Sequence, residues 1–371
     1  MNHRERFQAA CAHRAPDRPP VDYLAHRETD RKLRSHFGVG TERELLDILG
    51  SDFYYLSCRD ISQNETCVPF CKKSLPMTDR ERTCPLGIRW HRSPWNALGQ
   101  GQRGDGTNPT AKFTVDEAIR GPLSGAETER EILDHPWPKA SDFDFSALSG
   151  EAETAGDRVV IGGLWTGIMG DAYRMMGFED FLATCAAEPE LVKTLVRRLT
   201  DLYLELNDVI FRQMKGRMDV WFFGNDFGSQ GGLLIGKEMW TEIFFGEVRR
   251  LCAHAHGYGL KVMMHSCGSI VDLIPQLIEA GVDILDPIQV TAKGMEPAAL
   301  KARFGDRLVF HGAVDTQRVL PRGTPQEVRA HARETSEILG WDGGFVFAPS
   351  QILQADVPVG NIEAMYGVGE K

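Results

Sequence analysis

The sequence has 371 residues, of which 42% are hydrophobic and 25% are charged, and this composition excludes disordered, collagen-like and disulfide-scaffold proteins. Acidic residues number 52 against 42 basic ones, and the net charge of -10 argues against binding to a nucleic-acid backbone as the main role. A small local basic pocket for an anionic substrate is still compatible with this balance.

Signals for secretion and membrane insertion are missing from the sequence. The charged start, MNHRERFQAACAHRAPDRPP, has no apolar run of the kind a signal peptide needs. No later stretch approaches the roughly 18 apolar residues that cross a bilayer. We therefore expect a cytoplasmic protein, whose cysteines are free, buried or metal-bound rather than paired.

Short apolar runs predict the strands, and longer stretches with helical periodicity separate them. Most of these runs are continuously apolar, as in strands that are buried on both faces. In chain order they cover residues 19–25, 52–58, 158–167, 219–226, 261–267, 283–289, 307–315 and 344–350.

Helical patterns occupy the intervals, notably residues 189–214, 237–259 and 270–281. Alternating strands and helices imply right-handed βαβ units. Eight such strands fit a closed (β/α)8 TIM barrel better than an open sheet, so we expect a single α/β barrel domain over residues 1–371.

One segment interrupts the alternation. Residues 59–157 hold most of the Pro, Gly, Ser and Thr clusters and little periodic apolar pattern, which indicates a long insertion between the second and third strands. A hairpin is predicted around residues 83–94. Because a structureless segment of this length would be unusual, we expect the insertion to form a lid or flap.

Polar side chains gather at the predicted C-terminal strand ends, where the working residues of a barrel lie. They include Asp286, His311 and the pair His265 and Cys267 before a glycine turn. Residues two apart in an extended chain point to the same side, so this imidazole and thiol converge on one point. Both are preferred zinc ligands, and a catalytic zinc site uses three protein groups. The alternative is a hydrogen-bonded histidine beside a buried thiol, and spacing alone does not decide between them.

Other potential ligands form weaker patterns. His254 and His256 share the two-residue spacing but lie in a helical pattern, where such side chains diverge, so we expect solvent-exposed histidines. Cys67, Cys71 and Cys84 lack the spacing of a four-cysteine metal site. Scattered free thiols are the preferred interpretation, with a structural metal clip as the alternative.

Five blocks of sequence resemble the uroporphyrinogen decarboxylase superfamily. They are RERFQAACAHRAPDRPPVD near the start, GNDFGSQGGLLIGKEMW at 224–240, HSCG at 265–268, FHGAVDTQ at 310–317 and DVPVGNIEAM at 356–365. They occur in the family's order over nearly the whole chain, and the region 59–157 is matched least. The resemblance implies a (β/α)8 barrel, in agreement with the strand pattern.

The superfamily contains two chemistries. Its corrinoid-dependent methyltransferases hold zinc through a His-x-Cys pair and one later residue, and the HSCG segment is similar to theirs. Its decarboxylases remove the acetate arms of uroporphyrinogen without a cofactor and carry an RQAGRY signature after the first strand. Here that stretch reads AHRETDR, and the anionic substrate needs cationic partners, so the missing motif favours the methyltransferase branch. Asp60 would match a further decarboxylase aspartate only after a one-residue shift.

The third zinc ligand departs from the methyltransferase pattern. Counting seven residues back from Pro358 puts Gln351 where those enzymes have a ligand that is usually cysteine. The neutral, hard amide oxygen of glutamine is a poor zinc ligand. Asp226, Gln230 or Cys58 then completes the site, or metal binding is weak, or Gln351 contacts substrate.

The methyltransferase resemblance also implies a mechanism. Zinc at His265 and Cys267 would activate a thiol that attacks the methyl group of a cobalt corrinoid, or would activate a methylated donor in the opposite direction. Asp226 is expected to be the carboxyl acid for an oxygen-linked donor. The corrinoid is expected on a separate small carrier protein. Expected substrate contacts are Asn225, Asp226, Gln230 and Gln351, with support from Asp315 and an apolar wall from Trp165 and Tyr173.

Two alternatives stay open. As a decarboxylase, the protein would bind an anionic tetrapyrrole through arginines such as Arg18, Arg27 and Arg31. As a non-catalytic barrel it would only bind a ligand, although the polar strand ends argue against this. The sequence does not identify the methyl donor or acceptor, or the direction of transfer.

Overall fold

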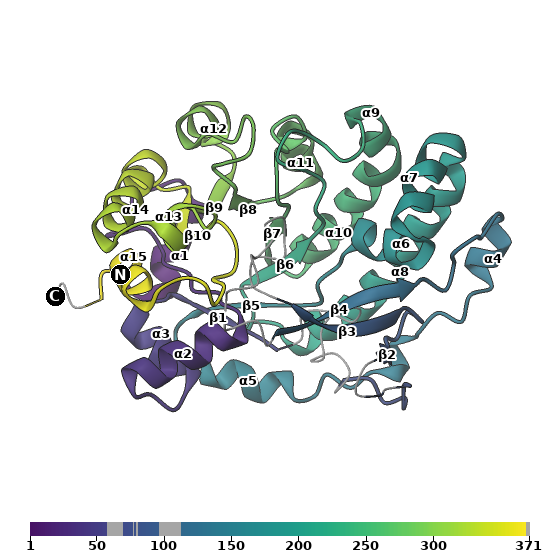
Figure 1. Ribbon diagram of the computed structural model, residues 1–371, viewed down its shortest axis with the longest axis horizontal. Helices are drawn as coiled ribbons and strands as arrows, with labels where there is room; N and C mark the ends of the chain where they lie inside the picture. Colours follow the sequence, from purple (N-terminus) through teal and green to yellow (C-terminus); the bar gives the residue numbers. More distant parts are fainter. Residues whose placement is uncertain (58–69, 77, 79–80, 96–112, 369–371) are drawn as a thin grey trace.

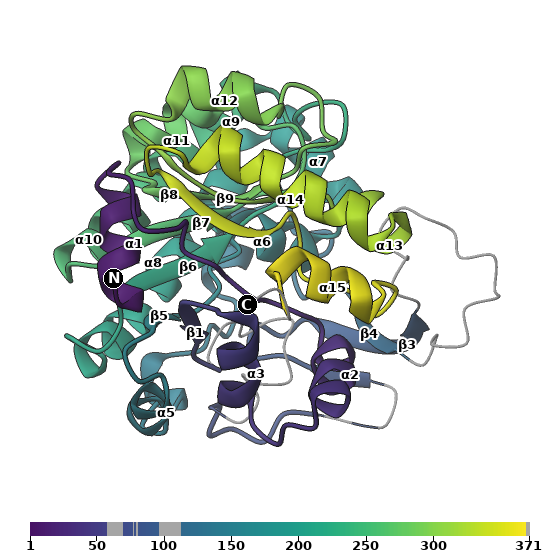
Figure 2. The same ribbon diagram turned by 90° about the vertical axis from the view of Figure 1, so that its left-hand side faces the viewer.

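The computed structural model describes residues 1–57, 70–76, 78, 81–95 and 113–368. Its central element is a curled, parallel, seven-stranded sheet of order β1-β5-β6-β7-β8-β9-β10, with helices around its outside (Figures 1 and 2). This arrangement agrees with the predicted α/β class and with a TIM-barrel-like fold. The strands are β1 (Phe53–Tyr55), β5 (Val159–Gly162), β6 (Val220–Gly224), β7 (Lys261–His265), β8 (Ile284–Ile288), β9 (Val309–Val314) and β10 (Phe345–Pro349).

Both faces of the sheet are buried, which explains why its strands are continuously apolar. Alternate side chains of each strand point to opposite faces. One set fills the inside of the curled sheet, and the other packs under the surrounding helices. The inner set consists of Phe53, Tyr55, Val159, Ile161, Val220, Phe222, Met263, Ile284, Val309 and Val346, together with Phe7 from the first helix.

The two edges of the sheet are joined by the residues around Val21. Val21 forms a parallel bridge with Phe347 of β10, and its carbonyl oxygen accepts a 2.7 Å hydrogen bond from the backbone N–H of Asp52, directly before β1. The strand predicted at 19–25 is therefore present only as isolated bridges. Two prolines open this stretch, and because they have no N–H they cannot donate to a ladder.

Asp52 fastens this junction with charged hydrogen bonds. Its carboxylate is fully buried and accepts from Arg6 Nη1 at 2.6 Å and from Arg18 Nη1 at 2.7 Å. It also accepts from His3 Nδ1 and from the backbone N–H of Val21, each at 2.7 Å. A buried carboxylate needs such a full set of partners. The network lies at the N-terminal end of β1.

Helices surround the sheet, and the first of them also sends Phe7 into the inner core of the sheet. None of the helices in the described part of the chain is both long and apolar enough to cross a bilayer. They are α1 (His3–Cys11), α2 (Arg27–Phe37), α3 (Glu42–Leu49), α4 (Glu129–Leu133), α5 (Leu148–Thr154), α6 (Ile168–Met176), α7 (Phe178–Ala187), α8 (Pro189–Gln213), α9 (Lys237–Trp240), α10 (Gly246–Gly257), α11 (Ile274–Ala280), α12 (Pro297–Phe304), α13 (Val319–Arg322), α14 (Pro325–Gly340) and α15 (Val359–Tyr366).

The predicted helices are found with local differences. The helix predicted at 189–214 is confirmed as α8, which begins at Pro189, a position where the missing N–H breaks no intrahelical bond. The helix predicted over 237–259 contains a π-helical turn, η3 (Thr241–Phe245), between α9 and α10. The pattern at 270–281 becomes helical only at α11.

The described residues between β1 and β5 form a second, antiparallel sheet of order β2-β3-β4. Its strands are β2 (Glu81–Thr83), β3 (Arg89–Trp95) and β4 (Phe113–Arg120), and the β2–β3 pairing confirms the predicted hairpin. The short 3-10 helix η2 (Ala140–Asp142) lies between α4 and α5. β4 packs against α6 at one side of the central sheet (Figure 1). A role of residues 59–157 as a lid stays a prediction.

Candidate metal centre

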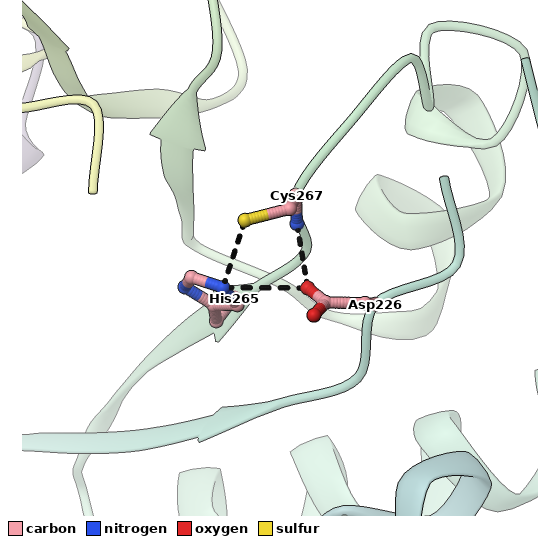
Figure 3. A group of neighbouring side chains, drawn as sticks. All are labelled: Asp226, His265 and Cys267. Atoms are coloured by element: carbon pink, nitrogen blue, oxygen red, sulfur yellow. Dashed lines mark hydrogen bonds and ion pairs between the residues drawn. The ribbon is translucent and has the colours of Figure 1, made fainter. Parts of the chain in front are cut away.

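Three potential metal ligands meet at the C-terminal ends of β6 and β7. Asp226 follows β6, His265 is the last residue of β7, and Cys267 lies in the turn after it (Figure 3). Cys267 Sγ is 3.4 Å from His265 Nε2, which is 3.4 Å from Asp226 Oδ1. The backbone N–H of Cys267 donates a 2.9 Å hydrogen bond to the same Asp226 oxygen. The imidazole and the thiol thus face one point, and a carboxylate joins them.

A glycine turn directs the thiol towards the imidazole. Gly268 has φ of +86°, and a Cβ at this position would lie 2.5 Å from the carbonyl carbon of Gly228. The hydroxyl of Ser266 accepts a 3.0 Å hydrogen bond from the backbone N–H of Phe227. The loops that follow β6 and β7 are therefore held against each other without room for a side chain between them.

Gly268→Ala should lower the free energy of unfolding by about 1–3 kcal/mol, because alanine is strained in the left-handed region and would clash with the opposite loop. Denaturant unfolding measures this change. Gly231→Ala is the matched control, since a Cβ on Gly231 would meet nothing within 4 Å. Equal stability of the two variants would contradict this account of the turn.

The charges of the three side chains are coupled. Burial opposes the charged imidazole, but the Cys267 thiolate and the carboxylates of Asp226 and Asp286 raise the pKa of His265 well above its ordinary value. Burial also raises the pKa of Cys267 and outweighs the opposite effect of His265. Desolvation would raise the pKa of Asp226, but the hydrogen bond and charge of His265 lower it to about 2. Asp226 is therefore ionised at neutral pH.

The donor set fits a zinc ion. One imidazole nitrogen, one thiol sulfur and one carboxylate oxygen lie within 4.8 Å of one another. Within the part of the chain that the structure describes, this is the one group of three or more His, Cys, Asp or Glu side chains arranged in this way. Nitrogen, sulfur and carboxylate oxygen are the ligands that zinc takes, and three protein ligands leave a position open for substrate.

Gln351 contacts the thiol of this group. Its Nε2 donates a 3.1 Å hydrogen bond to Cys267 Sγ, while its Oε1 accepts one of 2.8 Å from the backbone N–H of Ile352. The oxygen, which is the atom of this side chain able to ligate a metal, is therefore engaged by the backbone. The geometry agrees with glutamine as a neighbour of the ligands rather than as a ligand.

Behind His265 runs a chain of buried hydrogen bonds. His265 Nδ1 donates to Asp286 Oδ2 at 2.6 Å, and His311 Nδ1 donates to Asp286 Oδ1 at 2.6 Å. His311 Nε2 is 3.0 Å from Asp22 Oδ2, which also accepts a 2.5 Å hydrogen bond from Tyr55 Oη. All five side chains are buried. A carboxylate behind a ligating histidine fixes the orientation of its ring and raises its basicity.

The carboxylates in this chain are matched by cations. Burial would raise the pKa of Asp286, but the neighbouring His311 and His265 hold it well below its ordinary value. Burial opposes charging of His311, but Asp286 and Asp22 raise its pKa to about 9. At neutral pH a cationic imidazole therefore lies between two carboxyl groups.

A cavity of about 440 Å³ borders both the candidate ligands and the buried chain. Its size suits a small molecule. The ring of Trp165 lies 5.0 Å from that of Phe222 and 5.3 Å from that of His265, measured between centroids. Residues that line the cavity include Asp22, Trp165, Tyr173, Arg174, Phe222, Asn225, Asp226, His265, Asp286, His311 and Gln351.

Comparison with known proteins identifies the family. The model of the uroporphyrinogen decarboxylase family matches residues 128–370. The chain belongs to this family. The predicted resemblance is confirmed in this respect, although no curated protein matches the sequence.

Solved structures show which fold this family member shares. A methyltransferase from Methanosarcina mazei superposes with a TM-score of 0.64 at 15% identity, over 99% of this chain and 98% of that chain. A D-psicose 3-epimerase covers 62% of this chain and 83% of that chain at 9% identity, with a TM-score of 0.33 that is too low to support an argument. The first similarity extends over the complete fold, including both strands that carry the candidate ligands.

Several other residues predicted for the site reach the cavity of this family member. Trp165, Tyr173, Asn225 and Gln351 all line it. Asn225 also has a structural role, because its Oδ1 accepts a 2.6 Å hydrogen bond from the backbone N–H of Met169 in α6. That bond fixes the loop after β5 to the end of β6.

Two predicted substrate contacts lie elsewhere. Gln230 is hydrogen-bonded to Gln289 and Gln317 on neighbouring loops and is not among the residues that line the cavity. Asp315 is buried, and its Oδ1 accepts from the backbone N–H groups of Gln317 and Arg318, which caps the turn after β9. Both residues order the loops at the mouth rather than face the cavity.

The residues predicted for the decarboxylase alternative do not meet at the cavity. Arg18, Arg27 and Arg31 are not among its lining residues, and Arg18 is bonded to Asp52 at the N-terminal end of β1. Asp60 lies outside the described residues. Among the residues that the structure describes, Arg174 is the one lysine or arginine that lines the cavity.

The remaining candidate ligands are scattered. Cys71 and Cys84 are free thiols that do not belong to the candidate metal group, and Cys58 and Cys67 lie outside the described residues. The histidines at the end of α10 pair with carboxylates instead: His254 with Asp208 at 3.4 Å and His256 with Asp283 at 2.8 Å. Of these two, His256 is exposed as predicted and His254 is half-buried.

Sequence reasoning assigned no role to three groups beside the ligands. Asp286 and His311 stood out as polar strand ends, and Asp22 interrupts an otherwise apolar run after two prolines. A charged residue within a strand that is buried on both faces needs a partner, and this was the available signal. The pairing itself depends on which strands are neighbours.

Proposed function

We propose that this protein is a zinc-dependent methyltransferase that moves a methyl group between a small-molecule substrate or thiol and a corrinoid. The observation that carries the proposal is the convergence of Asp226, His265 and Cys267 beside the cavity. The fold shared with a methyltransferase from Methanosarcina mazei supports it.

In this proposal His265 and Cys267 hold zinc, and Asp226 replaces the usual later cysteine as the third ligand. When bound, zinc would supply a Lewis acid that polarises the oxygen or sulfur atom of the substrate. Asp286 orients His265 so that Nε2 is available for ligation. Trp165 and Tyr173 provide the apolar wall that excludes water from the methyl group.

The corrinoid is proposed as a co-substrate on a separate small carrier protein, which docks over the C-terminal strand ends. Polar strand ends at the barrel mouth are where this fold places its chemistry. We place the decarboxylase activity second, because the arginines expected to bind a tetrapyrrole do not line the cavity. A barrel that only binds a ligand ranks third.

Two assays of the zinc-loaded protein test the proposal. One measures methyl transfer from methylcobalamin to 2-mercaptoethanol, and the other measures transfer from a methylated donor to cob(I)alamin. The cobalamin absorption spectrum reports the transfer. Activity should disappear with a chelator and return with zinc but not with magnesium. Carbon dioxide release from uroporphyrinogen by zinc-free protein would establish the decarboxylase instead.

Zinc affinity should rise steeply with pH. Burial raises the pKa of Cys267 and opposes charging of His265, but the hydrogen bonds to Asp226 and Asp286 raise the pKa of His265, so both groups carry a proton at neutral pH in the metal-free protein. Each must lose that proton to become a ligand. The apparent affinity should therefore increase by up to about 100-fold per pH unit around neutrality. Competition with a chromophoric chelator measures it, and an affinity independent of pH would contradict the assignment.

Gln351→Cys should tighten zinc binding by about tenfold or more, because a thiolate then replaces the amide beside Cys267 Sγ. The same competition assay measures the change. Gln230→Cys is the matched control, since Gln230 does not line the cavity and should leave the affinity unchanged. If both variants behave alike, residue 351 is not at the metal.

A further inference from the structure

His311 is held between two carboxyl groups that are not among the three candidate ligands. Its Nδ1 faces Asp286 Oδ1 at 2.6 Å, and its Nε2 faces Asp22 Oδ2 at 3.0 Å. Asp286, His311 and Asp22 all reach the cavity. These are the ionisable groups that face the imidazole, from β8 and from the segment before α2. His311 and Asp22 are neither proposed ligands nor bonded to one, so metal binding alone does not explain why they are placed here.

The hydrogen-bond pattern around His311 requires one more proton than a neutral imidazole and two carboxylates carry. An ionised carboxylate only accepts hydrogen bonds, and a neutral imidazole donates from just one of its nitrogens. Because both nitrogens of His311 face carboxyl oxygens, one extra proton is required on His311, Asp22 or Asp286. Tyr55 Oη donates to the same Asp22 oxygen at 2.5 Å, and His265 Nδ1 donates to Asp286 at 2.6 Å. These donors stabilise the charged form of both carboxyl groups, which leaves the proton on His311.

Asp226 is unable to supply a proton. It was the expected acid, but as the proposed third ligand it would give its carboxylate oxygen to the metal, and a ligating carboxylate is deprotonated. The pKa of His311 is raised to about 9, so its proton is retained at neutral pH. A reaction in this cavity that consumes a proton therefore has His311 as its available source.

We propose, on the basis of the methyl-transfer function proposed above, that His311 and Asp22 form the acid pair of the reaction and that the methyl donor is an oxygen compound, a methyl ether or methanol. A thiol acceptor releases a proton and needs a base. An oxygen leaving group must gain a proton, and a site already loaded with one suits it.

The bond between the methyl carbon and the donor oxygen breaks, and its electron pair stays on that oxygen. The methyl carbon forms a bond to the cobalt of a cob(I) corrinoid, the co-substrate, which supplies both electrons of the new bond. The oxygen takes the proton that His311 Nε2 shares with Asp22, while the Nδ1–H of His311 keeps its bond to Asp286. The products are an alcohol or phenol and a methylated corrinoid, and the acid pair regains its proton from solvent.

Nuclear magnetic resonance of zinc-loaded protein with isotope-labelled histidine tests the proton store without any substrate. The signal that disappears in His311→Asn identifies the ring. We expect an imidazolium at neutral pH that loses its proton near pH 9. A neutral His311 ring at neutral pH would overturn the proposal.

Two ethers test the acid role, with cob(I)alamin as the probe co-substrate. 4-Nitromethoxybenzene releases a stable phenolate that needs no proton, whereas methoxybenzene requires one. His311→Asn should slow demethylation of methoxybenzene by about 10²–10⁴-fold and that of the nitro compound by less than about tenfold. His36→Asn is the matched control, because His36 also pairs with a carboxylate, Glu363, but on the exposed surface. It should behave as the unmodified protein.

Tyr55→Phe provides a milder variant that removes one hydroxyl group. Without the Tyr55 hydroxyl, the charged form of Asp22 loses a hydrogen-bond donor, so Asp22 competes more strongly for the proton and the pair as a whole releases it less readily. The alkaline limb of the rate profile with methoxybenzene should therefore move to higher pH. If the alkaline limb of this rate profile is at the same pH in Tyr55→Phe and in the unmodified protein, the proposed role of Asp22 is contradicted.

The outcomes separate this inference from the function on which it rests. A protein that binds no zinc refutes the proposed function. Zinc-dependent transfer from methylcobalamin to 2-mercaptoethanol, unaffected by His311→Asn and without any transfer from ethers or methanol, overturns the acid pair alone. Equal slowing of both ethers by His311→Asn shows a structural role and overturns it as well.

Discussion

Replacing His265 or Cys267 by alanine should weaken zinc binding by more than about 100-fold. Loss of a group that merely supports a metal ligand costs about 10–100-fold in affinity, and these two residues are the proposed ligands themselves. The unmodified protein should hold about one zinc per chain after dialysis, and each variant close to none. Metal analysis of the dialysed proteins, with circular dichroism to verify folding, measures the effect.

Two control variants match these substitutions. His256→Ala removes an exposed histidine that pairs with Asp283, and Cys71→Ala removes a free thiol outside the candidate group. Both should retain zinc. If His265→Ala and Cys267→Ala keep zinc as well, the metal lies elsewhere and the proposed function fails with it.

Asp52→Ala should lower the free energy of unfolding by about 3–5 kcal/mol, the cost of breaking a buried ion pair by removing one partner. Asp52 is fully buried, and its loss leaves the buried Arg6 guanidinium without one of its two carboxylate partners. The junction between the sheet edges at Val21 also loses a 2.7 Å hydrogen bond. Denaturant unfolding, followed by circular dichroism, measures the change.

Asp157→Ala is the control for this variant. Asp157 lies 3.7 Å from His3 at the same end of the sheet, but its side chain is 63% exposed. Exposed ion pairs contribute little, so its removal should change the free energy of unfolding by less than about 1 kcal/mol. A small effect of Asp52→Ala would show that the edges are held by packing alone.

The fold follows from the sequence because its strands are buried on both faces. Such strands read as continuous apolar runs, and seven of the predicted runs overlap β1, β5, β6, β7, β8, β9 and β10. The run at 19–25 is also largely apolar but forms only bridges, since two prolines remove donors at its start. The hydrophobic periodicity of residues 237–259 predicts one continuous helix and does not reveal the π-helical turn η3, which depends on tertiary packing.

The candidate site was predictable where it rests on local geometry. His265 and Cys267 are two residues apart at a strand end, so their convergence follows from the pleat of the chain. Asp226 was one of several options for a third ligand, because its position depends on β6 and β7 being neighbours. The contact between Asp22 and His311 joins residues 289 positions apart, and no local pattern reveals it.

The ionic junction around Asp52 and the candidate metal centre lie at opposite ends of the same parallel sheet, the first before β1 and the second after β6 and β7. Within the described ranges, none of the hydrogen-bond partners of Asp52 lines the cavity, so substitution of a side chain that lines the cavity removes none of them. Substitutions meant to change the substrate scope should therefore begin at Trp165, Tyr173 and Arg174, which line the cavity and are not partners of Asp52.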